Sequence, residues 1–160
     1  MQADVNFMES EGCCNEWRAP VIHDAIIAAI MNCRWNVNSE VMYGGVKVFH
    51  TREDADKAYH VLERMIDMGA DVNAVDSFGF SCVWRACLQA RQILPSYNHR
   101  EQTVGTERIL TSELAEDLKR IFTLLYERGM DVDYVKQGEE RTVREFYENE
   151  PVVQFLVFDD

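Results

Sequence analysis

The stretch that decides the fold is residues 62–90, LERMIDMGADVNAVDSFGFSCVWRACLQA. Its first part is typical of a helix end, because Leu62, Met65 and Ile66 form an apolar stripe at helical spacing. Gly69 then stands where a residue of left-handed conformation ends a helix. We therefore expect one helix to stop at this glycine and a compact turn to follow it.

The second part of the stretch predicts a turn and a new helix. Asp76 can bond its own backbone and Gly79 can adopt a positive φ, so residues 76–79 favour a tight turn. Apolar residues then return at helical spacing, at Val83, Ala86, Cys87 and Ala90. The whole stretch is thus interpreted as a helix, a hairpin-like turn and a second helix.

These residues resemble the ankyrin repeat. That family combines a Gly-Ala-Asp-Val-Asn segment and an Asp-x-x-Gly turn with a Thr-Pro-Leu-His-x-Ala helix start. Here GADVN occupies residues 69–73, the turn follows, and SCVWRA occupies residues 81–86. In the family the histidine ties neighbouring turns together by a hydrogen bond, a role that the resemblance implies for His23. Trp84 takes the place of that histidine in the second unit, so we expect it to pack between turns instead of bonding them.

The same signals recur along the chain. ADVN at residues 3–6 and GMDVD at residues 129–133 resemble the turn segment, and IHDA at residues 22–25 resembles the helix start. A weaker helix start is RTVRE at residues 141–145. Gly69 and Gly129 are 60 positions apart, whereas an ankyrin period is about 33 residues. We therefore expect insertions between the two helices of each unit, and units of about 1–68, 69–128 and 129–160.

Helical periodicity predicts six helical segments. Thr51 is expected to cap the second of them and Ser112 the fourth. A last short helix is expected to open at Pro151 and to carry an apolar tail. The predicted ranges are inner helices at 20–33, 81–94 and 141–149, outer helices at 51–68 and 112–128, and the final segment.

The two insertions differ in character. Residues 34–50 predict a small β-hairpin, with strands at 41–43 and 46–49 around a Gly44-Gly45 turn. Trp35 and Tyr43 either pack against this hairpin with Phe49 or provide anchors for a partner. Residues 95–112 are polar and without a clear period, which predicts a loop. The residues of that loop considered as partner contacts are Tyr97, His99 and Arg100.

Together these signals predict a single domain over residues 1–160. Its fold class is mainly α, an ankyrin-like helical-repeat solenoid with two full units and a partial C-terminal one. The apolar tail after Pro151 is expected to pack on the preceding helices, or to be covered by a partner or by a second copy in a homodimer.

The chain is acidic, with a formal net charge of −12, and residues 101–160 contribute −8 of it from 15 acidic and 7 basic residues. Direct nucleic-acid binding is disfavoured, because its affinity comes from lysine and arginine contacts to phosphates. A basic protein partner would be attracted by this field. The alternative is that the acidic end only keeps the protein soluble.

No apolar run approaches the ~18 residues that span a membrane, and the chain begins with polar residues. The five cysteines lack the spacing of a disulfide framework. We expect reduced thiols in a cytoplasmic protein. Motifs for phosphate binding, helical metal ligation or a nucleophile elbow are absent from the sequence. We therefore expect no enzyme activity, cofactor or metal. The alternative is an enzyme or metal protein that uses Cys13, Cys14 and a histidine.

Ankyrin arrays generally bind proteins through turn tips and the concave side of the inner helices. The resemblance therefore implies a protein-interaction module, and the size and charge suggest a binder or inhibitor of the immunity or anti-defence type. An alternative is a nucleic-acid mimic, in which residues 101–160 occupy a basic groove. The candidate partner-binding residues are Phe7, Met8, Asp24, Ile27, Trp35, Tyr43, Val75, Ser77, Phe78, Arg85, Gln89, Tyr97, His99 and Arg100.

Overall fold

The structure is a computed structural model that describes residues 3–10, 17–39 and 45–159, and this part of the chain is mixed, with six helices and two small antiparallel hairpins. The helices are α1 (Val21–Met31), α2 (Arg52–Asp67), α3 (Cys82–Ala90), α4 (Ser112–Glu127), α5 (Val143–Phe146) and the 3-10 helix η1 (Pro151–Leu156). The strands are β1 (Asn36–Ser39), β2 (Gly45–Val48), β3 (Tyr97–Asn98) and β4 (Thr103–Val104). The expected helices are thus present, and the described chain is a mixed structure in which two hairpins accompany them.

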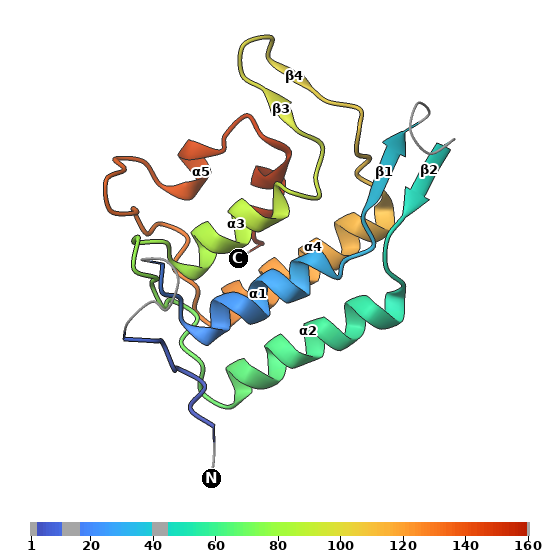
Figure 1. Ribbon diagram of the computed structural model, residues 1–160. Coiled ribbons are helices and arrows are strands. Elements are labelled where there is room, and N and C mark those ends of the chain that lie inside the picture. The colour runs from blue at the N-terminus through green and yellow to red at the C-terminus, as the bar shows by residue number, and fades with distance from the viewer. Residues whose placement is uncertain (1–2, 11–16, 40–44, 160) are drawn as a thin grey trace.

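The helices are arranged around α1. This helix packs most extensively against α3 and α2 and also contacts α4. Figure 1 shows α2, α1 and α3 side by side, with α4 behind α1. Both hairpins project from one end of these helices, while the turns after α2 and α4 lie at the other end (Figure 1). The molecule therefore has a hairpin end and a turn end.

The two long outer helices end in the same way. Gly69 after α2 has φ +98° and Gly129 after α4 has φ +94°, a region that side chains with a Cβ rarely adopt. In both places the next backbone N–H bonds back into the helix, from Ala70 to the carbonyl of Met65 and from Met130 to that of Leu125, each at 3.0 Å. These bonds satisfy carbonyls that the helix end would leave unpaired.

The helix starts confirm one predicted cap and correct the other. Thr51 forms a capping box with Asp54, in which each side chain bonds the backbone N–H of the other. For α4 the predicted cap Ser112 is wrong, because Ser112 is already helical. Thr111 is the last extended residue, and its Oγ1 accepts the N–H of Leu114 at 3.2 Å.

The first insertion contains the predicted hairpin. β2 overlaps the predicted strand at 46–49, but it pairs with β1 at Asn36–Ser39 and not with a strand at 41–43. β1 pairs with β2 so that Asn36 faces Val48 and Ser39 faces Gly45. Gly45 therefore belongs to a strand and not to a Gly-Gly turn. The expected strand at 41–43, with Tyr43, lies outside the described residues. Trp35 and Phe49 stack with ring centroids 4.2 Å apart, which is the packing role predicted for them.

The second insertion is not the plain loop that we expected. β3 and β4 form a short hairpin in which Tyr97 faces Val104. The side-chain oxygen of Asn98 accepts the N–H groups of Arg100 and Glu101 at 3.0 and 3.1 Å. The polar run that obscured any periodicity is thus a turn, held by an asparagine that bonds its own backbone.

The two insertions support each other, although they are far apart in sequence. The N–H of Asn38 donates to the carbonyl of Glu107 at 2.7 Å. The N–H of Ile109 donates to Oδ1 of Asn36 at 3.0 Å, and the Asn36 side chain is buried. A two-stranded hairpin is marginal by itself, so these contacts explain how β1 and β2 are held on the body of the protein.

The turns at the other end are joined by two equivalent asparagine bridges. Asn6 donates from Nδ2 to the carbonyl of Gly69 at 3.0 Å and accepts the N–H of Asp71 at 2.7 Å. Asn73 makes the same pair of bonds with Gly129 and Asp131, at 2.9 and 2.7 Å. Each asparagine therefore holds its own turn against the next one.

A second pair of equivalent contacts corrects the expectation for Trp84. In the first turn, Nε2 of the buried His23 lies 2.8 Å from the carbonyl of Ala74. In the second, Nε1 of Trp84 donates to the carbonyl of Tyr134 at 3.0 Å. Trp84 thus packs and also makes the bond that we had assigned to histidine alone, because the indole N–H replaces the imidazole N–H.

We expect Asn73→Ala to lower the free energy of unfolding by about 1 kcal/mol, because two bonds between adjacent turns are lost at an exposed site. Urea denaturation followed by circular dichroism measures this loss. Gln92→Ala, at an exposed position after α3, is the control for loss of an amide side chain. An Asn73→Ala protein as stable as the wild type would show that the bridge contributes nothing.

The buried His23 makes stability depend on pH. Burial lowers the pKa of His23 from its usual 6.5, so the folded protein holds a neutral imidazole. The unfolded chain binds a proton near pH 6.5, and the folded chain does so only at lower pH. The stabilisation is therefore complete above about pH 6.5 and decreases as the pH falls below it.

We therefore expect the urea midpoint of the wild type to fall between pH 7.5 and pH 5. The fall should be smaller in His23→Phe, in which no imidazole has to be protonated. His60→Phe, at an exposed position on α2, should keep the wild-type pH dependence. Equal falls in the two variants would show that His23 does not carry the effect.

The C-terminal tail packs on its own chain. Phe155 of η1 stacks on Phe122 of α4 at 6.0 Å, and Phe158 stacks on Tyr126 at 3.9 Å. Val157 between them is 75% exposed. Of the outcomes considered for this tail, packing on the preceding helices is thus observed.

None of the helices within the described ranges has the length and apolar character needed to cross a bilayer.

Candidate protein-interaction face

One side of the turn end gathers most of the residues that the sequence suggested for binding. We use the name inner face for the turn tips at residues 7–8 and 75–78 together with the exposed sides of α1 and α3. It contains nine of the candidate residues: Phe7, Met8, Asp24, Ile27, Val75, Ser77, Phe78, Arg85 and Gln89.

Backbone bonds bring the tips of the inner face together. The N–H of Val21 at the start of α1 donates to the carbonyl of Phe7 at 3.0 Å. Ser77 and Arg18 bond each other twice, with the N–H of each donating to an oxygen of the other at 2.9 Å. The tips are therefore fixed to one another and to the helix starts.

A buried carboxylate connects the second tip to α3. Oδ1 of Asp76 accepts the N–H groups of Phe78 and Phe80, and Oδ2 accepts Nε1 of Trp17 and a guanidinium N–H of Arg85, all at 2.8–2.9 Å. Burial alone would raise the pKa of Asp76, but these four hydrogen bonds outweigh it and lower the pKa. Asp76 is therefore an ionised anchor for the turn.

Arg85, which pairs with Asp76, also lies near two aromatic rings. Its guanidinium lies 5.3 Å from the ring of Trp17 and 5.0 Å from the ring of Phe80. Lys136 lies 4.9 Å from the same Phe80 ring. Arg85 is thus mainly engaged inside the molecule, and only a small part of it contributes to the surface.

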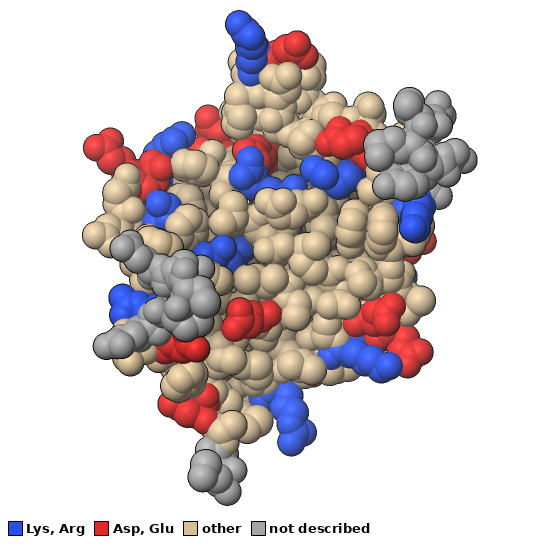
Figure 2. Space-filling model, in the orientation of Figure 1, with Lys and Arg blue, Asp and Glu red and all other residues tan. Residues whose placement is uncertain are grey.

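The inner face is apolar at its tips and poor in charge at its centre. Phe7 is 56% exposed and Phe78 is 52% exposed. Figure 2 shows that the surface over α1 is mostly uncharged, although acidic side-chain atoms lie over the first part of this helix. Asp24 and the partly buried Ile27 lie on α1 in this region. Depletion of charge at the centre is a feature of protein interfaces.

The remaining candidates do not belong to the inner face. Trp35 stacks on Phe49, and its Nε1 donates to the carbonyl of Met31, so it packs at the hairpin end. His99 lies 3.1 Å from Oε1 of the buried Glu150, while Tyr97 meets the His99 ring edge to face. Arg100 is exposed in the β3–β4 turn. The two insertions therefore form a separate surface.

Several residues of the inner face were missed by reasoning from sequence. Trp17 and Arg18 reach the second tip across 59 positions, and Phe80 lies between Arg85 and Lys136. No local pattern relates these residues, since periodicity and turn signals act over a few positions. The one available signal was Asp76, which sequence analysis had assigned only to its own turn.

Cys33, Cys82 and Cys87 are buried free thiols, and burial raises the pKa of Cys82 to about 12. Such thiols are not nucleophilic at neutral pH. Within residues 3–10, 17–39 and 45–159 there is no group of three or more residues placed to hold a metal ion. Cys13 and Cys14 lie outside these ranges.

Comparison with family models, with curated proteins and with solved structures yields no match for this chain.

Proposed function

We propose that the chain is an ankyrin-like helical-repeat solenoid that acts as a protein-interaction module. The repeated contacts support this interpretation: the Asn6 and Asn73 bridges are equivalent, and His23 and Trp84 bond equivalent carbonyls. Equivalent bonds in successive turns are what stacking of similar units requires. The third unit is partial, with α5 and η1 in place of two long helices.

The observation that carries the proposed function is the inner face. It combines exposed aromatic side chains with a centre that is poor in charge, where Asp24 is exposed, on a chain whose net charge is −12. Aromatic anchors in a surface depleted of charge are typical of the centre of protein interfaces. Its turn tips are fixed by bonds between units, so little conformational entropy is lost on binding.

We propose a basic protein as the partner, which makes this chain a small acidic binder or inhibitor. Residues 101–160 contribute −8 of the net charge and create a field that attracts positive charge. In the alternative, a nucleic-acid mimic, the acidic end itself is the contact. Glu140 and Glu148 are exposed and suit a test of it, whereas Glu145 belongs to the capping box of α5.

The test is affinity capture from the native cell extract with four proteins. The inner-face variant carries Ile27→Lys and Phe78→Lys, and a control of equal charge carries Val61→Lys and Met68→Lys on the opposite outer helix and its end. We expect one basic protein to be retained by the wild type and the control, and lost by the inner-face variant, because a buried lysine is costly at an interface.

The fourth protein carries Glu140→Lys and Glu148→Lys. Loss of the partner in this variant, with retention in the inner-face variant, would favour the mimic. Retention of the same partner by all four proteins would contradict both proposals. Circular dichroism of each variant confirms that it is folded before the comparison is made.

A further inference from the structure

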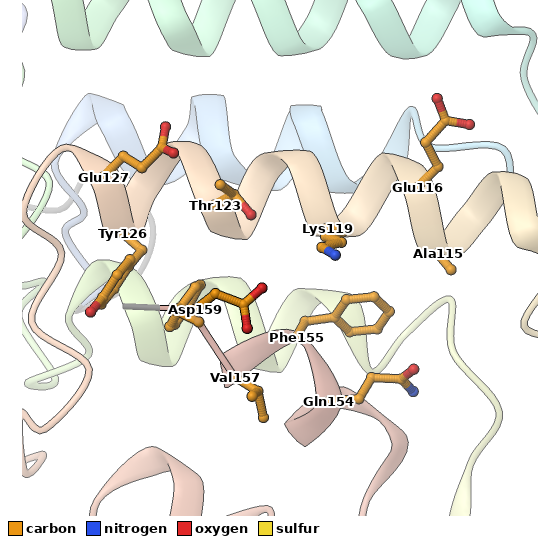
Figure 3. Close-up of a pocket in the computed structure, with 11 residues that line it drawn as sticks. Ala115, Glu116, Lys119, Thr123, Tyr126, Glu127, Gln154, Phe155, Val157 and Asp159 are labelled. Carbon is orange, nitrogen blue, oxygen red and sulfur yellow. The ribbon is translucent and has the colours of Figure 1, made fainter.

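A groove of about 660 Å³ lies between α4 and the C-terminal tail, away from the inner face. We name it the α4 groove. Ala115, Lys119 and Tyr126 border it from α4, and Phe155 and Val157 border it from the tail. Figure 3 shows Ala115 and Tyr126 pointing from α4 towards the tail, with Phe155 extending along the floor below them.

The α4 groove exists because the last helix is short. α4 has 16 residues and η1 has 6, which correspond to roughly 24 Å of α-helix and roughly 12 Å of 3-10 helix. On the other side of α4 lies α2, which also has 16 residues and is joined to α4 by the Arg120–Asp56 and Arg128–Asp67 ion pairs. About half of one flank of α4 therefore has no helix beside it.

The walls of the α4 groove suit the apolar side of a helix. Ala115 is small and allows close approach of another backbone to α4. Phe155 is held in place by its stack on Phe122, so the floor is preformed. Val157 is 75% exposed and offers further apolar surface at the edge. An apolar stripe at helical spacing is complementary to such a floor.

The charges around the α4 groove favour a positively charged occupant. Three of the charged residues that line it are carboxylates, Glu116, Glu127 and Asp159, and one is a lysine, Lys119. Arg34 and Arg52 pair with Glu116 and neutralise part of its charge. Glu127 and Asp159 border the groove from its two sides, at the end nearest Tyr126.

From the groove's shape, apolar floor and acidic rim we propose that it docks a basic amphipathic helix of a partner protein. The partner's helix lies beside α4, next to the short η1. Its apolar residues contact Ala115 and Phe155, and its lysines or arginines point towards Glu127 and Asp159. This is a second binding site, independent of the inner face, so the partner can be held from both sides.

The experiment uses two labelled peptides of about 14 residues, roughly 21 Å as helices. One is built from leucine and lysine with an apolar face, and the other carries glutamate in place of lysine. Fluorescence anisotropy at 150 mM salt measures binding to the full chain. We expect the lysine peptide to bind and the glutamate peptide not to bind.

Two variants locate the site. Ala115→Trp fills the α4 groove without changing the charge and should weaken binding of the lysine peptide about tenfold. Ala58→Trp is the matched control, because Ala58 is also partly buried on a long helix but does not line the groove. It should bind like the wild type. Amide chemical shifts should move around residues 115–127 and 153–159.

Three results would overturn the proposal. The first is failure of the lysine peptide to bind, or equal binding of both peptides. The second is equal weakening by Ala115→Trp and Ala58→Trp, or shifts confined to α1 and α3. The third is a wild-type dimer in sedimentation that Ala115→Trp dissociates, since the occupant would then be a second copy. Variants of the inner face leave peptide binding unchanged, so this test stands apart from the capture experiment.

Discussion

Trp84→Ala is expected to lower the free energy of unfolding by about 3–5 kcal/mol, a large share of the stability of a domain of this size. The indole belongs to α3, is 1% exposed and packs against α5 and the residue after it. Its ring meets Phe146 at 5.3 Å and Tyr147 at 6.1 Å, and its Nε1 bonds the carbonyl of Tyr134. The truncation removes both packing and a bond between turns.

Trp84→Phe separates these two contributions. It keeps most of the aromatic packing and leaves the Tyr134 carbonyl without its donor, which costs about 1–3 kcal/mol. Urea denaturation followed by far-UV circular dichroism, which reports on the backbone, measures the free energy of unfolding of both variants. If Trp84→Phe were as stable as the wild type, the bond would have no energetic role. If Trp84→Ala lost less than 1 kcal/mol, the placement of α5 on α3 would be wrong.

Asp117→Ala is expected to cost about 3 kcal/mol, because it leaves a mostly buried guanidinium with only the exposed Glu116 as a charged partner. Asp117 is 2% exposed, and its two oxygens accept from Nε and from a terminal nitrogen of Arg34 at 3.0 and 2.8 Å. The N–H of Arg34 also donates to the same carboxylate at 3.0 Å. Hydrogen bonding to Asp117 raises the pKa of Arg34, so the guanidinium stays charged.

A neighbouring ion pair provides the comparison for Asp117. Arg120 and Asp56 also join the outer helix to a neighbour, but Asp56 is accessible to solvent. We expect Asp56→Ala to change stability little, because exposed pairs contribute weakly. Similar losses from Asp117→Ala and Asp56→Ala, measured by urea denaturation, would contradict the view that burial makes the Arg34 pair important.

Local signals in the sequence predicted the elements well. Gly69 and Gly129 ended helices as expected, since positive φ is a property of the residue itself. Thr51 capped its helix, and a hairpin was found within residues 34–50. The errors were also local: Thr111 replaced Ser112 as cap, and Gly45 lay in a strand instead of a turn. Boundaries depend on tertiary contacts that short patterns do not contain.

The contacts between distant segments could not be predicted. Arg34 and Asp117 are 83 positions apart, and nothing in either neighbourhood indicates the other. Trp84 was expected only to pack, because it stands where the ankyrin pattern has a histidine. The sequence does not show that its indole N–H reaches the equivalent carbonyl, that of Tyr134. In both cases the partner is determined by how the helices stack.

The candidate surfaces show the same division. The tips Phe7 and Phe78 were found from their positions in the turns, and they are exposed. The α4 groove was not predicted: the sequence predicted the short final helix that opens at Pro151, but not how this helix lies against α4. The groove results from the difference in length between α4 and η1, and a difference in length between two helices has no sequence motif.

The central claim is that successive turns are joined by one repeated bridge, which builds the inner face. Amide hydrogen exchange at Asp71 and Asp131 tests it directly, because these N–H groups bond Asn6 and Asn73 respectively. We predict that Asn6→Ala speeds exchange at Asp71 and leaves Asp131 protected, while Asn73→Ala does the reverse. Unchanged exchange at both amides, or fast exchange in the wild type, would contradict the claim.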